Sequence, residues 1–550
     1  MMRNFEEVTA FLGHWGRFQQ VVFFLLLAST IPNGLGFVSV VFISAIPKHH
    51  CKIPDVNLTL EWLSVIIPAK IINGHQELSS CTRYKLDVVR NYSAQGLLPG
   101  IDVNLTNLEE ESCLDGWNYS KEIFQSTIVS QFDLVCNDGW KQPFSSTVYF
   151  LGVLFGSFFA GHIADRYGRK PVFFITMAVQ TVFTVALIFS PSWVIFAIIF
   201  FISGMGQMAN YVAAFVLGTE TLSGKIRILF SSLGVCLGFT IGSLSVPLIA
   251  FLLRDWKPFL LATSLPALIY LLLWWFIPES PRWLFSQGRL EEAEAIIRKA
   301  AKMNKVEAPE DIFSDYCTEK ELSECKEAKP NVLDLLRNRK MRPITPILWL
   351  VWFTLLTGYY GLTLNSGNLS SDPYLSTFIS AAVELPAYIF VWLTMQYLPR
   401  RLTLIGVTLL GGLALFFIQL VPKSLPPLSI TLEMLGKYGF TSGATLVFTY
   451  TAEIYPTPIR STATGTCSIF SRVGTCIAPF LFQLREIYEH LPYILLGSMT
   501  LISALAILFL PETFGKPLPE TIGQMSERTR VKCPCLTQRP KSVVDLESRM

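Results

Sequence analysis

The stretch ETLSGKIR at residues 220–227 returns as EIYPTPIR at residues 453–460, with glutamate, isoleucine and arginine at matching places. The two glutamates are 233 positions apart (453 minus 220), and the same offset relates PES at 278–280 to PET at 511–513. GRK at 168–170 corresponds to PRR at 399–401, at an offset of 231. Three matched positions at nearly one offset indicate that the chain consists of two related halves.

The composition is typical of a membrane protein, with 51% hydrophobic residues, 15% charged residues and a mean hydropathy of +0.44 over 550 residues. The net charge of +3 is too small to indicate a nucleic-acid partner. Apolar segments of about 20 residues, enough to cross ~30 Å of hydrocarbon, occur twelve times in two groups of six. They are 21–45, 146–164, 171–190, 194–219, 228–253, 259–278, 344–365, 374–397, 402–421, 427–452, 461–483 and 491–511.

The first apolar segment is predicted to be a retained span. No small-residue cleavage site follows 21–45, and the segment 1–20 is mixed in charge rather than basic. The predicted spans therefore form two blocks, 146–278 after the first span and 344–511 in the second half.

The polar stretch 46–145 carries four cysteines and four glycosylation sequons. This density predicts an oxidising, glycosylated, extracellular loop. Four cysteines allow three pairings, and the sequence does not choose among them. The cysteines are Cys51, Cys81, Cys113 and Cys136, and the sequon asparagines are Asn57, Asn91, Asn104 and Asn118.

Basic residues in the short loops agree with this orientation. The loops after the second, fourth, eighth and tenth spans hold eight lysines and arginines, against four in the short outer loops. The segments 1–20, 279–343 and 512–550 are then cytoplasmic. The connection 279–343 contains GRLEEAEAIIRKAAKMN, an amphipathic pattern that favours a surface helix, interpreted as a solvated connector rather than a binding element.

Two six-span halves of the same orientation predict an all-α membrane protein with the major facilitator fold: twelve transmembrane helices and a substrate site between the halves at mid-depth. GHIADRYGRKP at 161–171 resembles the cytoplasmic loop motif of that superfamily, and PESPRWL at 278–284 resembles a motif of its organic-ion branch, solute carrier family 22. The resemblance implies a gating role for seven charged residues. They are Asp165, Arg166, Arg169, Glu220, Arg227, Glu453 and Arg460.

A closer resemblance is carried by EVTAFLGHWGRFQ, ESCLDGW, NYVAAFVLGTE, LWWFIPESPRWL and YTAEIYPT, which are similar to the novel organic cation and carnitine transporters. It covers the chain except about the last twenty residues. The chain departs from that pattern at Phe239, where tyrosine is expected, and at LTLNSGNLSSD (362–372). Near the outer end of the eleventh span, FQLREIYEHLPY is more similar to the cation-selective branch.

Aromatic residues of the spans are candidates for a cation site, because ring faces attract an ammonium that cannot donate hydrogen bonds. Trp352 and Tyr359, seven residues apart, share a helix face. Tyr211 shares a face with Gln207, and Phe448 and Tyr450 lie on the tenth span. The resemblance implies that Tyr211, Trp352 and Tyr359 line the substrate cavity; ordinary packing is the alternative for every ring.

Arg472 places a full positive charge inside the apolar eleventh span. Ser468 and Thr475 lie one turn to either side of it and form a polar strip on the same helix face. The resemblance implies that cation-selective relatives have aspartate here, whereas anion and carnitine transporters have arginine. A guanidinium fork suits a carboxylate, so we expect Arg472 to bind the carboxylate of a zwitterion. The alternative is a structural ion pair, for instance with Glu384, unless Lys437 takes that partner.

The resemblance also implies a sodium site at Asn33, Gln180 and Gln207, with interhelical hydrogen bonding as the alternative. No phosphate-cradling loop or metal-ligand spacing is present in the sequence, so we expect no ATP hydrolysis, no cofactor and no enzyme activity. The sequence predicts a monomeric plasma-membrane transporter of organic zwitterions and cations, such as carnitine or ergothioneine, with both termini cytoplasmic. The alternatives are a broad organic cation or anion facilitator and a non-transporting receptor or sensor.

Overall fold

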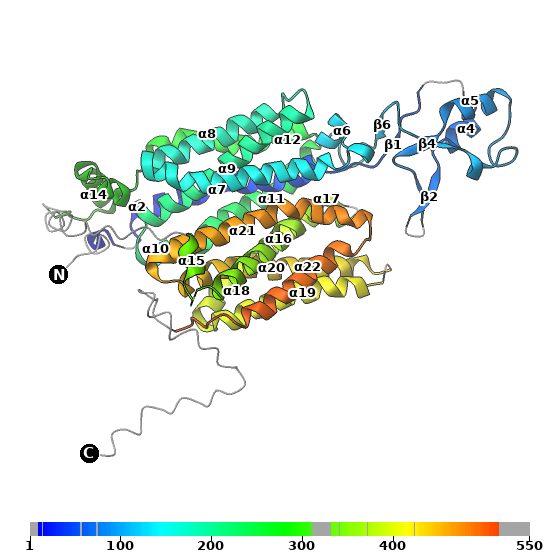
Figure 1. The fold of residues 1–550 in the computed structure, drawn as a ribbon. Helices are drawn as coiled ribbons and strands as arrows, with labels where there is room; N and C mark the ends of the chain where they lie inside the picture. Colours follow the sequence, from blue (N-terminus) through cyan, green and yellow to red (C-terminus); the bar gives the residue numbers. More distant parts are fainter. Residues whose placement is uncertain are drawn as a thin grey trace, which may run out of the picture.

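The computed structural model describes most of the chain. The described residues are 9–13, 15–54, 58–72, 75–309, 312, 332–339, 341–370, 372–422 and 424–515. Long helices dominate, and three two-stranded antiparallel sheets lie outside them (Figure 1). Two bundles of helices lie side by side, the first coloured blue to green and the second green to red (Figure 1).

The bundle of the N-terminal half contains the helices before residue 272, apart from those in the loop between α3 and α7. They are α2 (Arg17–Ser29), α3 (Ile31–Ile43), α7 (Lys141–Tyr167), α8 (Arg169–Leu187), α9 (Trp193–Thr221), α10 (Gly224–Leu229), α11 (Val235–Leu253) and α12 (Trp256–Leu271). The expected span 21–45 is divided at Thr30, whose hydroxyl donates to the carbonyl of Leu27 at 2.7 Å. Pro32, which has no N–H, then lies in the first turn of α3.

The C-terminal half repeats this arrangement. Its helices are α16 (Ile344–Asn365), α17 (Pro373–Ala382), α18 (Glu384–Tyr397), α19 (Arg400–Phe417), α20 (Pro426–Ile454), α21 (Thr457–Gln483) and α22 (Leu491–Ile507). The expected span 374–397 consists of α17 and α18, divided at Val383. In the described chain, ten helical segments are long and apolar enough to cross a membrane, and α22 is a shorter apolar helix.

Helices within the N-terminal half approach closely at glycines. A Cβ on Gly34 of α3 would lie 2.0 Å from the Phe239 carbonyl oxygen, and one on Gly152 of α7 would lie 2.1 Å from the Phe201 carbonyl oxygen. Small residues allow such backbone contact inside a bilayer. Between the halves, α7 packs on α21 and α11 on α17. At the outer ends, Thr147 donates to the Cys476 carbonyl at 2.8 Å.

The loop between α3 and α7 folds into a small domain that projects beyond the ends of the helices (Figure 1). Strands β1 (His49–Cys51) and β6 (Trp117–Tyr119) pair antiparallel, as do β2 (Ala69–Ile72) with β3 (His75–Leu78), and β4 (Thr82–Tyr84) with β5 (Glu110–Ser112). Helices α4 (Leu60–Val65) and α5 (Leu86–Ala94) complete it around Trp62. Disulfides join Cys51 to Cys113 and Cys81 to Cys136.

The connection between the halves includes α13 (Pro281–Ser286), α14 (Leu290–Asn304) and α15 (Val332–Arg337). Helix α14 is not a purely solvated connector, because Ala293, Ile297, Ala300 and Ala301 are buried. Asn304 at its end accepts the Phe18 backbone N–H at 2.8 Å and donates to the Leu12 carbonyl at 3.0 Å. These bonds tie α14 to the start of α2.

Candidate functional site

Arg472 of α21 lies where the two halves meet. Its Nη1 donates to the hydroxyl of Tyr360, on α16 of the same half, at 2.9 Å. Its Nη2 lies 3.5 Å from Sδ of Met208, on α9 of the other half. The residue is 9% exposed, and its Nε has no hydrogen-bond partner. Within the described chain Arg472 has no ion-pair partner, so the alternative of an ion pair with Glu384 is wrong.

Aromatic rings from both halves surround the Arg472 partner Tyr360. The Tyr360 ring centroid lies 5.0 Å from that of Phe37 on α3, 5.6 Å from Phe150 on α7 and 5.1 Å from Tyr359. Phe239 on α11 continues this group, 5.8 Å from Phe37 and 6.4 Å from Tyr211. The structure therefore brings Tyr211, Phe239 and Tyr359 near the Arg472 region.

Sequence reasoning missed Tyr360 and Met208. Tyr360 directly follows the candidate Tyr359, but adjacent residues on a helix point about 100° apart, so no face shared with Tyr359 could reveal it. Met208 follows Gln207 in the same way. The signal would have been a tyrosine that lies next to the buried arginine on a facing helix. That neighbour relation can be known only from how the helices pack.

Glu384 of α18 pairs with Lys437 of α20. Lys437 Nζ lies 3.1 Å from Glu384 Oε1, and the Tyr359 hydroxyl donates to the same oxygen at 2.9 Å. Lys437 also donates to the Thr363 hydroxyl. The other carboxylate oxygen, Oε2 of Glu384, is buried without a hydrogen-bond partner. A buried ion pair is stable only when its remaining polar atoms are also satisfied, and this oxygen of Glu384 has no partner within the described chain.

The remaining aromatic candidates lie elsewhere. Trp352 is fully buried and donates from Nε1 to Thr451 Oγ1 at 2.9 Å, and its ring lies 4.2 Å from Phe448. Tyr450 donates to the Pro511 carbonyl at 2.6 Å, close to the end of α22. The carbonyl of Ser468 accepts from Ser471 one turn before Arg472. Trp352 and Phe448 form a pair about two helical turns from Tyr359.

A neutral polar cluster occupies the N-terminal half. Asn33 Nδ2 donates to Asn210 Oδ1 at 3.1 Å, and Gln207 Nε2 donates to the Asn33 carbonyl at 2.5 Å. Gln180 Nε2 donates to the Pro32 carbonyl at 3.4 Å. Asn33 Oδ1 and Gln180 Oε1 are buried and accept no hydrogen bond. The structure thus brings all three candidate sodium residues together and leaves two neutral oxygens free.

Charged residues where α7 ends, α8 begins and α9 ends form one network in the N-terminal half. Arg169 contacts Glu220 through Nη2 at 3.0 Å and Nε at 3.1 Å, and Asp165 through Nη1 at 2.8 Å. Glu279 Oε1 accepts the backbone N–H of Arg169 at 3.0 Å. Burial raises the pKa of Glu279 above its usual value, although three backbone N–H donors oppose the shift. Arg166 is exposed and lies over Tyr167.

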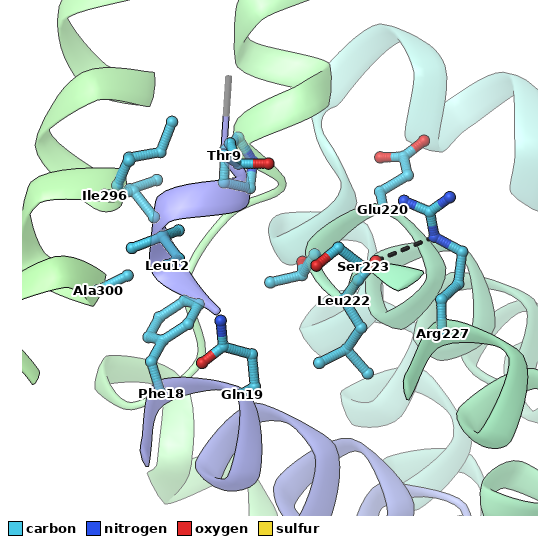
Figure 2. Close-up of a pocket in the computed structure, with 13 residues that line it drawn as sticks. Thr9, Leu12, Phe18, Gln19, Glu220, Leu222, Ser223, Arg227, Ile296 and Ala300 are labelled. Atoms are coloured by element: carbon cyan, nitrogen blue, oxygen red, sulfur yellow. Dashed lines mark hydrogen bonds between the residues drawn. The ribbon is translucent and has the colours of Figure 1, made fainter. Parts of the chain in front are cut away.

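Figure 2 shows the edge of this network, where a cavity of about 30 Å³ lies between the N-terminal segment, α14 and the end of α9. Leu12 and Phe18 face Ile296 and Ala300 on one side of it (Figure 2). Across the cavity, Arg227 Nε donates to the Leu222 carbonyl at 3.0 Å, the dashed line in Figure 2.

The C-terminal half repeats the network at the offset seen in the sequence. Arg400 Nε contacts Glu453 Oε1 at 3.4 Å, the Arg400 N–H donates to Glu512 at 2.9 Å, and Arg460 Nε donates to the Tyr455 carbonyl at 3.3 Å. Thr513 donates to Glu453 at 2.6 Å, as Ser280 does to Glu220 at the same distance. The sequence repeat is therefore a repeat of contacts.

Three sequon asparagines, Asn91, Asn104 and Asn118, are exposed on the outer domain, whereas Asn57 lies outside the described residues. Burial and the nearby Asp133 carboxylate raise the pKa of Tyr119 in this domain. Its hydroxyl donates to Asp133 at 3.0 Å, so it stays a neutral donor. The exposed asparagines are accessible to modification.

Comparisons with known proteins give the family. A family model described as "Sugar (and other) transporter" matches residues 118–523. The chain is 50% identical over 525 residues to "Organic cation/carnitine transporter 2" of Rattus norvegicus, covering 95% of this chain and 94% of the relative. It is also 50% identical to "Solute carrier family 22 member 4" of Mus musculus over 533 residues, covering 97% of this chain and 96% of the relative.

Among solved structures, the partially occluded inward-open xylose transporter XylE from E. coli matches with a TM-score of 0.58 and 17% identity, covering 90% of this chain and 99% of that chain. This likeness confirms the predicted major facilitator fold. The relatives are transporters and not enzymes, which confirms the prediction of no enzyme activity. The chain belongs to the sugar (and other) transporter family of the major facilitator superfamily, and within it to solute carrier family 22.

Proposed function

We propose that the chain is a plasma-membrane transporter that carries organic zwitterions, such as carnitine or ergothioneine-like betaines, and more weakly simple organic cations. It works by alternating access, with substrate bound between the halves and sodium bound in the N-terminal half. The relatives named for organic cations and carnitine support the substrate class. The exposed sequons and two disulfides of the outer domain support an extracellular position for it, with both termini cytoplasmic.

The observation that carries the proposal is the buried Arg472 guanidinium without a counter-ion. A desolvated charge is costly in the membrane interior, and an unsatisfied buried donor adds to that cost. A substrate carboxylate satisfies both needs, because it can take two parallel N–H donors of a guanidinium fork. The free Nε and the contacts of Arg472 to both halves support a ligand position there.

The ammonium end of the substrate is assigned to the aromatic group beside Arg472. Ring faces attract a quaternary ammonium within about 6 Å of the centroid. Tyr211, Phe239 and Tyr359 reach this region from both halves. Trp352 and Phe448 are assigned to the wall of the pathway further toward the cytoplasm.

Sodium is assigned to the neutral cluster. Interhelical hydrogen bonding accounts for the amide donors of Asn33, Gln180 and Gln207 but leaves Asn33 Oδ1 and Gln180 Oε1 unused. Neutral oxygens are suitable ligands for a hard cation. The two free acceptors favour a cation over ordinary packing.

The test is paired uptake of carnitine and tetraethylammonium, normalised to protein at the cell surface, in the wild type, Arg472→Lys and Arg472→Ala. Losing a charged partner in a desolvated site costs roughly 2–5 kcal/mol, so Arg472→Ala should lower the apparent affinity for carnitine by about thirtyfold or more. Tetraethylammonium uptake should change little. Arg472→Lys keeps the positive charge without the guanidinium fork, so its apparent affinity for carnitine should lie between those of the wild type and Arg472→Ala. A parallel loss of both substrates would contradict the proposal.

Accumulation itself separates a carrier from a receptor on the same fold. Vesicles containing the purified chain should accumulate carnitine in a saturable manner, and an inward sodium gradient should increase the accumulation. Binding without accumulation would favour the receptor, and accumulation independent of sodium would remove the sodium assignment alone.

A further inference from the structure

The Lys437 ammonium lies between an aromatic ring and a carboxylate. Its Nζ lies 4.0 Å from the ring centroid of Tyr359 and 3.1 Å from Glu384 Oε1. The side chains of Lys437 and Glu384 are 1% and 3% exposed. A ring face and a carboxylate together are what an ammonium group favours.

The Lys437 and Glu384 pair faces the meeting of the halves. Tyr359, which contacts both groups, lies 5.1 Å from Tyr360 between ring centroids, and the Tyr360 ring lies 5.0 Å from Phe37 of the other half. Helices α11 and α18 are in contact. The pair is therefore at the interface where the substrate site is proposed.

Charge at this site does not balance. Arg472 and Lys437 contribute two positive charges and Glu384 one negative charge. Glu433, one turn before Lys437, is bonded apart from them to Asn365 and to Tyr493, which also accepts from Arg485. One positive charge is therefore unmatched among Arg472, Lys437 and Glu384. The charged groups are joined through adjacent tyrosines: Arg472 contacts Tyr360, and Tyr359 donates to Glu384. At low effective dielectric such groups sense each other over several ångströms. A simple cation meets a net positive site, whereas a carboxylate-bearing substrate restores neutrality.

We propose that Glu384 and the face of Tyr359 form a cation subsite, and that Lys437 occupies it and is the residue that makes the chain favour carboxylate-bearing substrates over simple cations. This inference rests on the proposed function. Lys437 acts as a built-in competitor: its ammonium takes one face of the Tyr359 ring and one carboxylate oxygen of Glu384, and Glu384 Oε2 remains free. Selectivity by a repulsive element of this kind complements the attraction of Arg472 for carboxylate.

The experiment removes the competitor. Lys437→Met keeps the length of the side chain without its charge, so the ratio of tetraethylammonium to carnitine uptake should rise by about tenfold or more. Lys437→Arg keeps the charge and should leave the ratio near that of the wild type. Glu384→Gln/Lys437→Met lacks the carboxylate, so it should show no gain for tetraethylammonium. An unchanged ratio in Lys437→Met, or the same gain in the double variant, would overturn the inference.

Glu384→Gln provides a second measurement, in case Lys437→Met does not reach the surface. With Lys437 present and no carboxylate, the site has two unmatched positive charges. Tetraethylammonium should then inhibit carnitine uptake about tenfold less well than in the wild type. Equal inhibition would contradict the cation subsite. If Arg472→Ala loses carnitine selectively but these variants do not behave as stated, the subsite fails and the proposed function stands; if the wild type accumulates neither substrate, the proposed function fails.

Discussion

The buried polar groups of the two halves differ in kind. In the N-terminal half, the groups described at mid-depth are the amides of Asn33, Gln180, Gln207 and Asn210. In the C-terminal half they include charged residues. These are Glu384, Glu433, Lys437 and Arg472. Charge at mid-depth is expensive and neutral amides are less so. The difference agrees with the proposed roles, in which Arg472 of the C-terminal half binds the substrate carboxylate between the halves and the amides of the N-terminal half bind sodium.

The charged networks at the helix ends of the two halves are much more alike. Arg169 and Arg400, Glu220 and Glu453, and their backbone contacts match pair by pair. One difference stands out: Asp165 supports Arg169, whereas the residue at the same offset of 231 in the second half is Gln396. The halves therefore differ in their polar groups at mid-depth and remain similar in the charged networks at these helix ends.

The largest effect should come from removing a free oxygen of the N-terminal half. Asn33→Leu eliminates Oδ1 and the donor to Asn210. The coupling between sodium and substrate is typically 5–150-fold, so the sodium stimulation of carnitine uptake should largely disappear while sodium-independent uptake remains. Ser39→Ala, on the same helix, loses only a bond to the Gly36 carbonyl and is the control. An equal loss with and without sodium would break the proposed division between the halves.

A smaller effect is expected from the two latches. Arg169→Gln breaks a two-pronged contact to Glu220 at 3.0 and 3.1 Å, whereas Arg400→Gln breaks one at 3.4 Å. Since the latch lies far from the substrate, turnover should fall with little change in KM. We expect about a tenfold loss for Arg169→Gln and a few-fold loss for Arg400→Gln, because breaking a more buried pair costs more. Initial rates over a range of carnitine concentrations give turnover and KM for each variant. Equal losses of turnover in the two variants would show the latches to be equivalent.

Exchange of the one differing residue sharpens the same comparison. The Asp165 side chain is 73% exposed, and exposed ion pairs contribute only ~0.2–1 kcal/mol. Asp165→Asn should lower turnover about twofold and leave carnitine affinity unchanged. Gln396→Asp places a carboxylate at the matching position of the second half, near Arg400. It should change turnover by a similar factor, about twofold. Loss of affinity together with turnover in either variant would indicate a folding defect.

The smallest effect on transport should come from the outer domain, which has no counterpart of its size in the second half. Cys81→Ser removes one disulfide and should reduce delivery to the surface, because a cross-link over tens of residues stabilises by about 4 kcal/mol. Uptake per delivered molecule should stay the same. Thiol labelling should find Cys136 free and Cys113 protected; labelling of Cys113 instead would contradict the pairing in the structure.

The sequence predicted most of the fold because span length and internal repetition are local or one-dimensional properties. Hydropathy located the spans, and the 233-residue offset located the related halves. The break at Thr30 was missed, since a helix interrupted by one residue keeps its apolar pattern. The disulfide pairing could not be chosen, because it depends on the packing of β1, β4 and their neighbours.

The candidate site was predicted in part. Arg472 was identifiable because a charge in an apolar segment is conspicuous, and the three sodium candidates lie together. Their roles stay predictions. The contacts that set the charge of the site could not be read from sequence: Lys437 and Glu384 are 53 residues apart (437 minus 384) on different helices. Nothing in either segment shows that the lysine lies on the face of Tyr359.

The outer domain has a mechanical consequence for measurement. It is continuous with α3 and α7 (Figure 1), has its own apolar core around Trp62, and is closed by two disulfides, so in the proposed rocking motion we expect it to follow the N-terminal half. Tyr374 of α17 donates to the Ile123 carbonyl at 2.8 Å, a bond from the other half to the base of this domain. When the halves rock, the domain is a lever whose tip travels further than the helices do. A fluorophore near Asn104 therefore reports the rotation with more gain than a label on a membrane helix.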